Sequence, residues 1–284
     1  MIRGRMSLAP LPITDTRDLF RPVSRELLTL LSGLTAEDWL QPTRAGSWSV
    51  RDVVAHLVDG ALRRLSFHRD ALKPPSAALI RSERDLVVFI NELNRDWVQV
   101  SARLSPRVLT DLYSLASNQL ADFFESLSLD APALFGVSWA GEETSAGWFD
   151  IGRDFTELWH HQMQIRMAVG AAPLEDPRYL RAVLEIAVRG LPHAFRDAPG
   201  ERGDAVLLEV SGSAGGVWTL KHDGVWQIWT GRDASPRLRV QVSDDTLARL
   251  LFHALTPQEA MPLMGVEGDH ALLPALIAAR SVIV

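Results

Sequence analysis

The chain has 284 residues, a length that suits either one large domain or two ordinary ones. Its hydrophobic fraction of 47% and charged fraction of 23% are typical of a soluble globular protein. The net charge of −6 and the lack of a basic run argue against a nucleic-acid partner, because binding phosphates requires clustered lysine and arginine. No stretch is apolar over the roughly 20 residues that cross a bilayer, and the N-terminus lacks the apolar core of a secretory signal. We therefore expect a cytoplasmic protein without a membrane partner.

The sequence contains no cysteine. This excludes disulfides, zinc–thiolate sites and a catalytic thiol of the protein itself. Any metal ion must be held by nitrogen and oxygen ligands, and any sulfur chemistry must use a thiol from outside.

Apolar residues recur at helical spacing through the first half of the chain. They predict helices at Asp18 to Leu34, Val50 to about Asp70, Leu86 to Arg103, Pro106 to beyond Phe124, and Ile151 to Val169. Ser49 followed by Asp52 is typical of a capping box at the start of the second helix. Gly170 followed by Pro173 is a stop signal for the last one.

The second half combines helices with strands. A helix is predicted from Pro177 to Asp197, and alternating residues predict strands at Ala205 to Ser211, Val217 to Lys221, Val225 to Thr230, and Leu238 to Val242. Asp223-Gly224 is a hairpin signal. Further helices are predicted at Asp244 to Leu255, after the capping box of Thr256, and at His270 to Arg280. The expected fold class is mixed, α followed by α/β, in two domains: a helical bundle over residues 1–173 and an α+β domain with an antiparallel sheet over residues 174–284.

Three residues of the first half could hold a divalent metal. Glu157 and His161 are four residues apart on a predicted helix, which places both side chains on one face. Carboxylate oxygen and imidazole nitrogen suit zinc, iron, nickel or manganese. His56, in the middle of another apolar helix, is the best candidate for a third ligand. The residues alone leave two plainer interpretations open: a surface pair at 157 and 161, and a histidine at 56 that packs in the core.

Two segments carry a family resemblance. Residues 46–57 (GSWSVRDVVAHL) resemble the start of the second helix in the DinB-like superfamily, where a ligand histidine follows a tryptophan by eight residues. Residues 157–165 (ELWHHQMQI) resemble a later helix of that superfamily, with a first ligand and then a double histidine whose second member is a ligand. Glutamate at the first position is similar to the mycothiol-dependent maleylpyruvate isomerase branch. The resemblance implies a four-helix bundle with His56, Glu157 and His161 as metal ligands.

The second domain supports the same branch. Three segments resemble the sterol-carrier-protein-like domain that follows the bundle there: residues 223–228 (DGVWQI), 243–251 (SDDTLARLL) and 266–272 (VEGDHAL). One position departs from the pattern. Three residues after the second histidine, the isomerase-type helix commonly has aspartate, whereas this chain has Gln164, which is more typical of the wider superfamily. The resemblance therefore does not fix the reaction.

Three functions follow as hypotheses. Three protein ligands leave coordination positions open, as in catalytic sites. A divalent ion bound there would activate a thiol or a water molecule. Zinc is favoured over nickel, iron or manganese. The first hypothesis is an enzyme that uses a low-molecular-weight thiol for transfer to, or isomerisation of, a small electrophilic substrate. The second is a metal-dependent hydrolase on the same ligands. The third is an apolar-ligand-binding protein without enzymatic activity, with the bundle as a scaffold or a homodimer surface.

Other polar residues have plainer expected roles. His160 is expected to support or pack beside the site rather than bind metal, and Asp59 and His68 are expected to face solvent. Trp48 is expected to pack at the start of its helix. Three arginines of the second domain could meet a substrate carboxylate at the metal: Arg232, Arg237 and Arg239.

Overall fold

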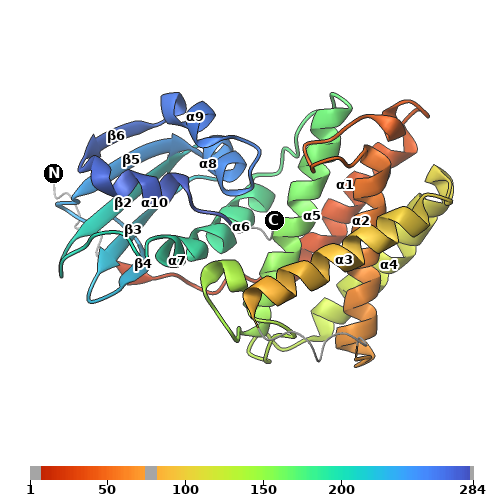
Figure 1. The fold of residues 1–284 in the computed structure, drawn as a ribbon, viewed down its shortest axis with the longest axis horizontal. Coiled ribbons are helices and arrows are strands. Elements are labelled where there is room, and N and C mark those ends of the chain that lie inside the picture. The colour runs from red at the N-terminus through yellow and green to blue at the C-terminus, as the bar shows by residue number, and fades with distance from the viewer. Residues whose placement is uncertain (1–7, 74–81, 282–284) are drawn as a thin grey trace. The chain divides into compact units, whose positions relative to one another are not determined.

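The computed structural model describes residues 8–73 and 82–281 (Figure 1). Their contacts divide into two compact units. The helical unit contains the described residues between 15 and 135 and residues 145–175. The sheet unit contains residues 8–14, 136–144 and 176–281. Both units are therefore built from more than one stretch of the chain.

The helical unit is a bundle, as the sequence predicts. Its helices are α1 (Phe20–Ser32), α2 (Val50–Arg63), α3 (Glu83–Ser101), α4 (Pro106–Ser126) and α5 (Gly147–Ala168). Contacts run in a closed ring from α1 to α4, α2, α5 and back to α1, and α3 packs against α2. The core of this ring contains the buried side chains Val23, Leu27, Val54, Val58, Leu109, Tyr113, Phe124, Phe155 and Ile165.

Helix α2 begins at the predicted capping box. The carboxylate of Asp52 accepts hydrogen bonds from the backbone nitrogen and the hydroxyl of Ser49, over 3.0 and 2.8 Å. After Arg63 the α-helical pattern gives way to a π-helical segment, Arg64–Arg69, so the predicted helix to about Asp70 is correct in extent. Such segments change which side chains face the core.

Helix α5 begins four residues earlier than the sequence predicts. It is buried on nearly every face, including its polar residues Asp150, His160, His161 and Gln164. An all-round buried helix has no polar stripe, and for that reason its start is hard to locate from periodicity. It ends as predicted, with Gly170 at a positive φ of 67°.

The sheet unit contains a six-stranded mixed sheet in the order β1-β4-β3-β2-β5-β6. The strands are β1 (Ala9–Pro10), β2 (Ala205–Ser211), β3 (Gly216–His222), β4 (Trp226–Thr230), β5 (Leu238–Ser243) and β6 (Gly265–Gly268). The predicted hairpin joins β3 to β4, with Gly224 at φ 85°. The expected mixed fold class is confirmed, but the sheet is not purely antiparallel, because β2 and β5 are parallel. Alternation along one strand indicates a strand without indicating its partner or direction, and the short strands β1 and β6 carry no such pattern.

The helices of this unit are shorter than predicted. They are α6 (Pro177–Ala187), α7 (Leu191–Ala194), α8 (Asp244–Leu251), α9 (Pro257–Ala260) and α10 (Leu273–Ile277). The single helix expected from Pro177 to Asp197 is interrupted by a 3-10 turn at Val188–Gly190. Pro192 explains the break, because proline has no N–H for the carbonyl four residues earlier and its ring crowds that carbonyl. Among the described residues, no helix is both long and apolar enough to cross a membrane.

Candidate metal centre

The structure brings His56, Glu157 and His161 together. His56 comes from α2, and the other two come from adjacent turns of α5. Each residue offers one nitrogen or oxygen atom, and these three atoms all lie within 4.8 Å of one another. Among the described residues, His56, Glu157 and His161 form the one group of three histidine or acidic side chains that are close enough together to hold a metal ion. The i, i+4 spacing on α5 supplies two members, and only the packing of α2 against α5 supplies the third.

The distances within this triad fit a small divalent ion. Nε2 of His161 lies 3.3 Å from Oε2 of Glu157. Ligand atoms about 2.1 Å from a tetrahedral zinc ion are about 3.4 Å apart, by simple geometry. The rings of His56 and His161 meet edge to face, with centroids 4.7 Å apart. The three side chains therefore need only small adjustments to share one ion.

Electrostatics favour the protonation states that a metal requires. Burial lowers the pKa of His56 to about 3, with a further lowering by His161 against smaller opposing effects of Glu157 and Asn94. Burial raises the pKa of Glu157, but the hydrogen bond with His161 and the neighbouring histidines outweigh it and hold that pKa at about 2. A neutral imidazole and an ionised carboxylate are the forms that bind metal ions.

One buried atom in the triad has no ordinary partner. Nδ1 of His56 is buried and makes no hydrogen bond. Buried polar atoms are nearly always satisfied, and an exception needs an explanation such as an ion. A triad of two imidazoles and one carboxylate, in a chain without thiols, is a donor set typical of zinc and other divalent metals. The residues present therefore fit a divalent metal.

Gln164 contacts the triad, although the sequence marks it only as a departure from the family pattern. Nδ1 of His161 lies 2.8 Å from Oε1 of Gln164, and Nε2 of Gln164 lies 2.9 Å from Nε2 of His160. His160 thus lies next to the triad, with its ring 5.4 Å from that of His161 between centroids, and Gln164 contacts both rings. This agrees with its expected supporting role.

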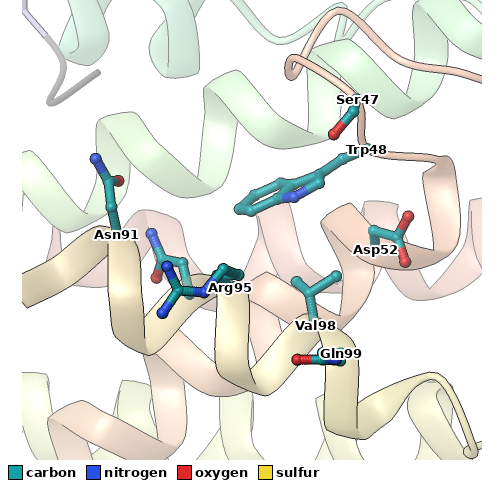
Figure 2. Close-up of a pocket in the computed structure, with 8 residues that line it drawn as sticks. Ser47, Trp48, Asp52, Asn91, Arg95, Val98 and Gln99 are labelled. Atoms are coloured by element: carbon teal, nitrogen blue, oxygen red, sulfur yellow. The ribbon is translucent and has the colours of Figure 1, made fainter. Parts of the chain in front are cut away.

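A pocket of about 450 Å³ opens between the start of α2 and α3 (Figure 2). It is lined by Ser47, Trp48 and Asp52 from the start of α2 and by Asn91, Asn94, Arg95, Val98 and Gln99 from α3. Figure 2 shows the indole ring of Trp48 on one side and the side chains of α3 on the other. The sequence predicts only a packing role for Trp48, but its ring also lies 5.1 Å from the ring of His56, between centroids. Trp48 therefore lines the pocket and also contacts His56.

Asn94 is a second link between the pocket and the centre. It lines the pocket, interacts with His56, and accepts a hydrogen bond from Nη2 of Arg63 over 2.7 Å. Sequence analysis missed it, because an asparagine on an amphipathic helix carries no signal of its own.

One expectation for a nearby residue is wrong, and a second is met only in part. Asp59 is buried rather than in solvent, and its carboxylate lies 3.0 Å from Nε of Arg63. Burial raises the pKa of Asp59 to about 6, although Arg63 opposes the rise. His68 is only partly exposed: its Nδ1 is buried and its ring meets Phe123 edge to face. These positions are covered by an ion pair and a ring contact, which helical periodicity does not describe.

The three arginines of the second domain have partners within the sheet unit. Arg237 pairs with Asp204 and Asp269. Arg232 and Arg239 both pair with Glu209. Their charges are therefore matched by acids of the same unit.

Comparison with known proteins identifies the family to which this chain belongs. The family profile described as "Mycothiol maleylpyruvate isomerase N-terminal domain" matches residues 20–166, a range that includes all three members of the triad. Two solved structures, of the mycothiol-dependent maleylpyruvate isomerase and of a histidine-to-alanine mutant of it, align with 84% of this chain and 88% of their own. The TM-score is 0.50 for both, and the identities are 15% and 14%, so this likeness concerns the fold alone.

A further structure, Sterol Carrier Protein 2 from Yarrowia lipolytica, aligns with 55% of this chain and 95% of its own at 14% identity, but the TM-score of 0.25 is too low to support an argument. No curated protein sequence matches this chain. The family profile covers more than half of the 284 residues. It thereby confirms the resemblance in the two helical segments, and the chain belongs to the mycothiol maleylpyruvate isomerase N-terminal domain family.

Proposed function

We propose that this protein is a metal-dependent enzyme that uses an external low-molecular-weight thiol, and that its reaction is the isomerisation of a small electrophilic substrate. The observation that carries the proposal is the meeting of His56 with Glu157 and His161 beside a pocket, in a chain of this family. The absence of cysteine means that the thiol must come from outside.

The triad would hold the metal, with zinc as the expected ion. A divalent ion held by two neutral imidazoles and one carboxylate would have a net charge of about +1 and would favour the thiolate form of an added thiol. His56, Glu157 and His161 would supply three ligands and leave room for the thiol sulfur, as in catalytic zinc sites. In the isomerisation, the thiolate adds to one carbon of an electron-poor double bond, the resulting single bond rotates, and the thiolate leaves again.

The pocket would hold the rest of the thiol or the substrate. Asp52 already accepts hydrogen bonds at the start of α2, and the exposed Arg95 bonds to Asp96. The groups best placed to receive a ligand are therefore the amides of Asn91 and Gln99, the Ser47 hydroxyl and the indole of Trp48. These groups suit a polar ligand better than an apolar one.

Elemental analysis of purified protein tests the metal. We expect about one divalent metal ion per chain in the native protein and in the control His270→Ala, which removes an exposed histidine of the sheet unit. We expect most of the metal to be lost in His161→Ala, because two remaining ligands hold a divalent ion weakly. Equal metal content in all three proteins contradicts the proposed site.

Turnover tests the reaction. We expect cis–trans isomerisation of maleylpyruvate by the metal-loaded protein only when mycothiol or another small thiol is added. Hydrolysis of esters or amides without thiol would instead support a metal-dependent hydrolase. Binding of fatty ligands by protein that contains no metal would support a non-enzymatic apolar-ligand-binding protein.

A further inference from the structure

Gln164 lies one turn beyond the paired histidines of α5. The spacings of three and four residues place its amide against both His161 and His160. All three side chains are buried, so water does not compete for these hydrogen bonds. The amide oxygen lies 2.8 Å from Nδ1 of His161, and the amide nitrogen lies 2.9 Å from Nε2 of His160.

The chemistry of the amide determines where the protons lie. An amide oxygen only accepts, so Nδ1 of His161 must carry a hydrogen and donate it. The amide nitrogen only donates, so Nε2 of His160 must accept. With Nδ1 donating to Gln164, the second nitrogen of His161, Nε2, is the one that faces Glu157, 3.3 Å away, and it is the nitrogen that would bind a metal. Turning the amide over would reverse the proton placement on both histidines, so the contacts of Gln164 with His160 and His161 are coupled through one amide.

We propose that Gln164, which also contacts His160, is the positioning residue of the candidate metal centre: it keeps the proton on Nδ1 of His161 and directs Nε2 toward Glu157. The inference rests on the metal-binding part of the proposed function. Metal-bound histidines generally donate their other N–H to an oxygen acceptor, and loss of that acceptor weakens metal binding. Because the amide of Gln164 is neutral, it adds no negative charge to the centre.

Nitrogen-15 NMR of the imidazole side chains tests the proton placement directly. In wild-type protein without metal, we expect the Nδ1 resonance of His161 to be that of a protonated nitrogen, coupled to a slowly exchanging hydrogen. An unprotonated Nδ1 overturns the proposal. This measurement needs no variant and no bound metal, so it remains decisive even if the protein binds no zinc and the proposed function fails.

Zinc affinity, measured by competition with a chromophoric chelator, tests the consequence. We expect Gln164→Leu, which removes the acceptor, to weaken zinc binding by about 10- to 100-fold. Gln164→Glu keeps an acceptor oxygen and should bind zinc at least as tightly as wild type. The control Gln258→Leu changes an exposed glutamine of the sheet unit and should have no effect. Circular dichroism establishes that each variant is folded. A folded Gln164→Leu protein with wild-type affinity shows that Gln164 only fills space and overturns the proposal.

Discussion

Arg64 and Asp150 form a two-pronged ion pair inside the helical unit, in which Nη1 and Nη2 of the guanidinium donate to the two carboxylate oxygens over 2.8 and 2.6 Å. Arg64 follows α2 directly, about two turns beyond His56, and Asp150 is in the first turn of α5, about two turns before Glu157. The pair therefore joins the same two helices that carry the triad. It holds their register along the helix axes.

Removal of the arginine is expected to destabilise the bundle strongly. Arg64 also donates to Asp154 over 2.6 Å, so Arg64→Met leaves two acids of a buried network with Arg153 as their remaining partner. We expect the free energy of unfolding in urea to fall by about 3 to 5 kcal/mol. The control Arg69→Met removes an exposed pair with Asp70 and should change it by less than about 1 kcal/mol. If both substitutions lower the free energy of unfolding equally, the buried pair contributes no more to stability than the exposed one.

The same network predicts how stability depends on pH. Burial raises the pKa of Asp150, but Arg64 and Arg153 outweigh it and hold the pKa at about 2, below the ordinary value of 3.8. An acid whose pKa is lower in the folded state stabilises the fold when ionised. This contribution, about 2 kcal/mol, is fully present above about pH 4 and is lost as the pH falls toward 2. We expect the free energy of unfolding to drop across that window and Asp150→Asn to flatten the drop. If the free energy of unfolding of Asp150→Asn falls with pH as steeply as that of wild type, other groups cause the acid sensitivity.

Zinc should stabilise the folded protein. A ligand that binds only the folded state at 100 times its Kd adds about 2.7 kcal/mol to the free energy of unfolding. Thermal melts should therefore move upward with zinc and return with a chelator. In Glu157→Gln, the rise in melting temperature on adding zinc should vanish, whatever the melting temperature of the variant without zinc. It should persist in Glu92→Gln, a control on the exposed surface of α3. An increment that survives in Glu157→Gln would place the metal elsewhere.

The pocket should affect ligand binding without affecting the metal. Asn91 and Gln99 are exposed side chains two turns apart on α3, so their replacement should leave the core intact. We expect the double substitution Asn91→Leu with Gln99→Leu to raise KM for the thiol or the substrate, while metal content stays at the wild-type level. Steady-state kinetics at varied thiol and varied substrate would identify which ligand is affected. Unchanged KM for both would exclude this pocket as their site.

Local signals of the sequence were sufficient for most elements. The capping box of Ser49, the hairpin glycine Gly224 and the stop at Gly170 act through hydrogen bonds and backbone angles of adjacent residues, and all three are found as predicted. The parallel pairing of β2 with β5 was not predicted, because it depends on which strand edge remains open after the hairpin has formed.

Part of the candidate centre could also be predicted from residues close together in the sequence. Glu157 and His161 share a face by helical geometry, but the arrival of His56 beside them depends on how α2 packs against α5. The sequence predicts a solvent position for Asp59, since an isolated acid in a helix usually lies there, but the structure buries it beside Arg63. Burial of a charge depends on partners from other turns and helices, and periodicity does not describe them.

By itself, the sequence determined most of the helices and strands, the lack of a protein thiol, and the pair of donors one turn apart on α5. Only the tertiary structure decided that His56 completes a triad, that Gln164 contacts His161, and that a pocket opens along Trp48. Neighbours along a helix are fixed by its 3.6-residue repeat. Neighbours across helices depend instead on side-chain packing and on buried ion pairs such as that of Arg64 with Asp150, which bring together residues about 100 positions apart in the chain.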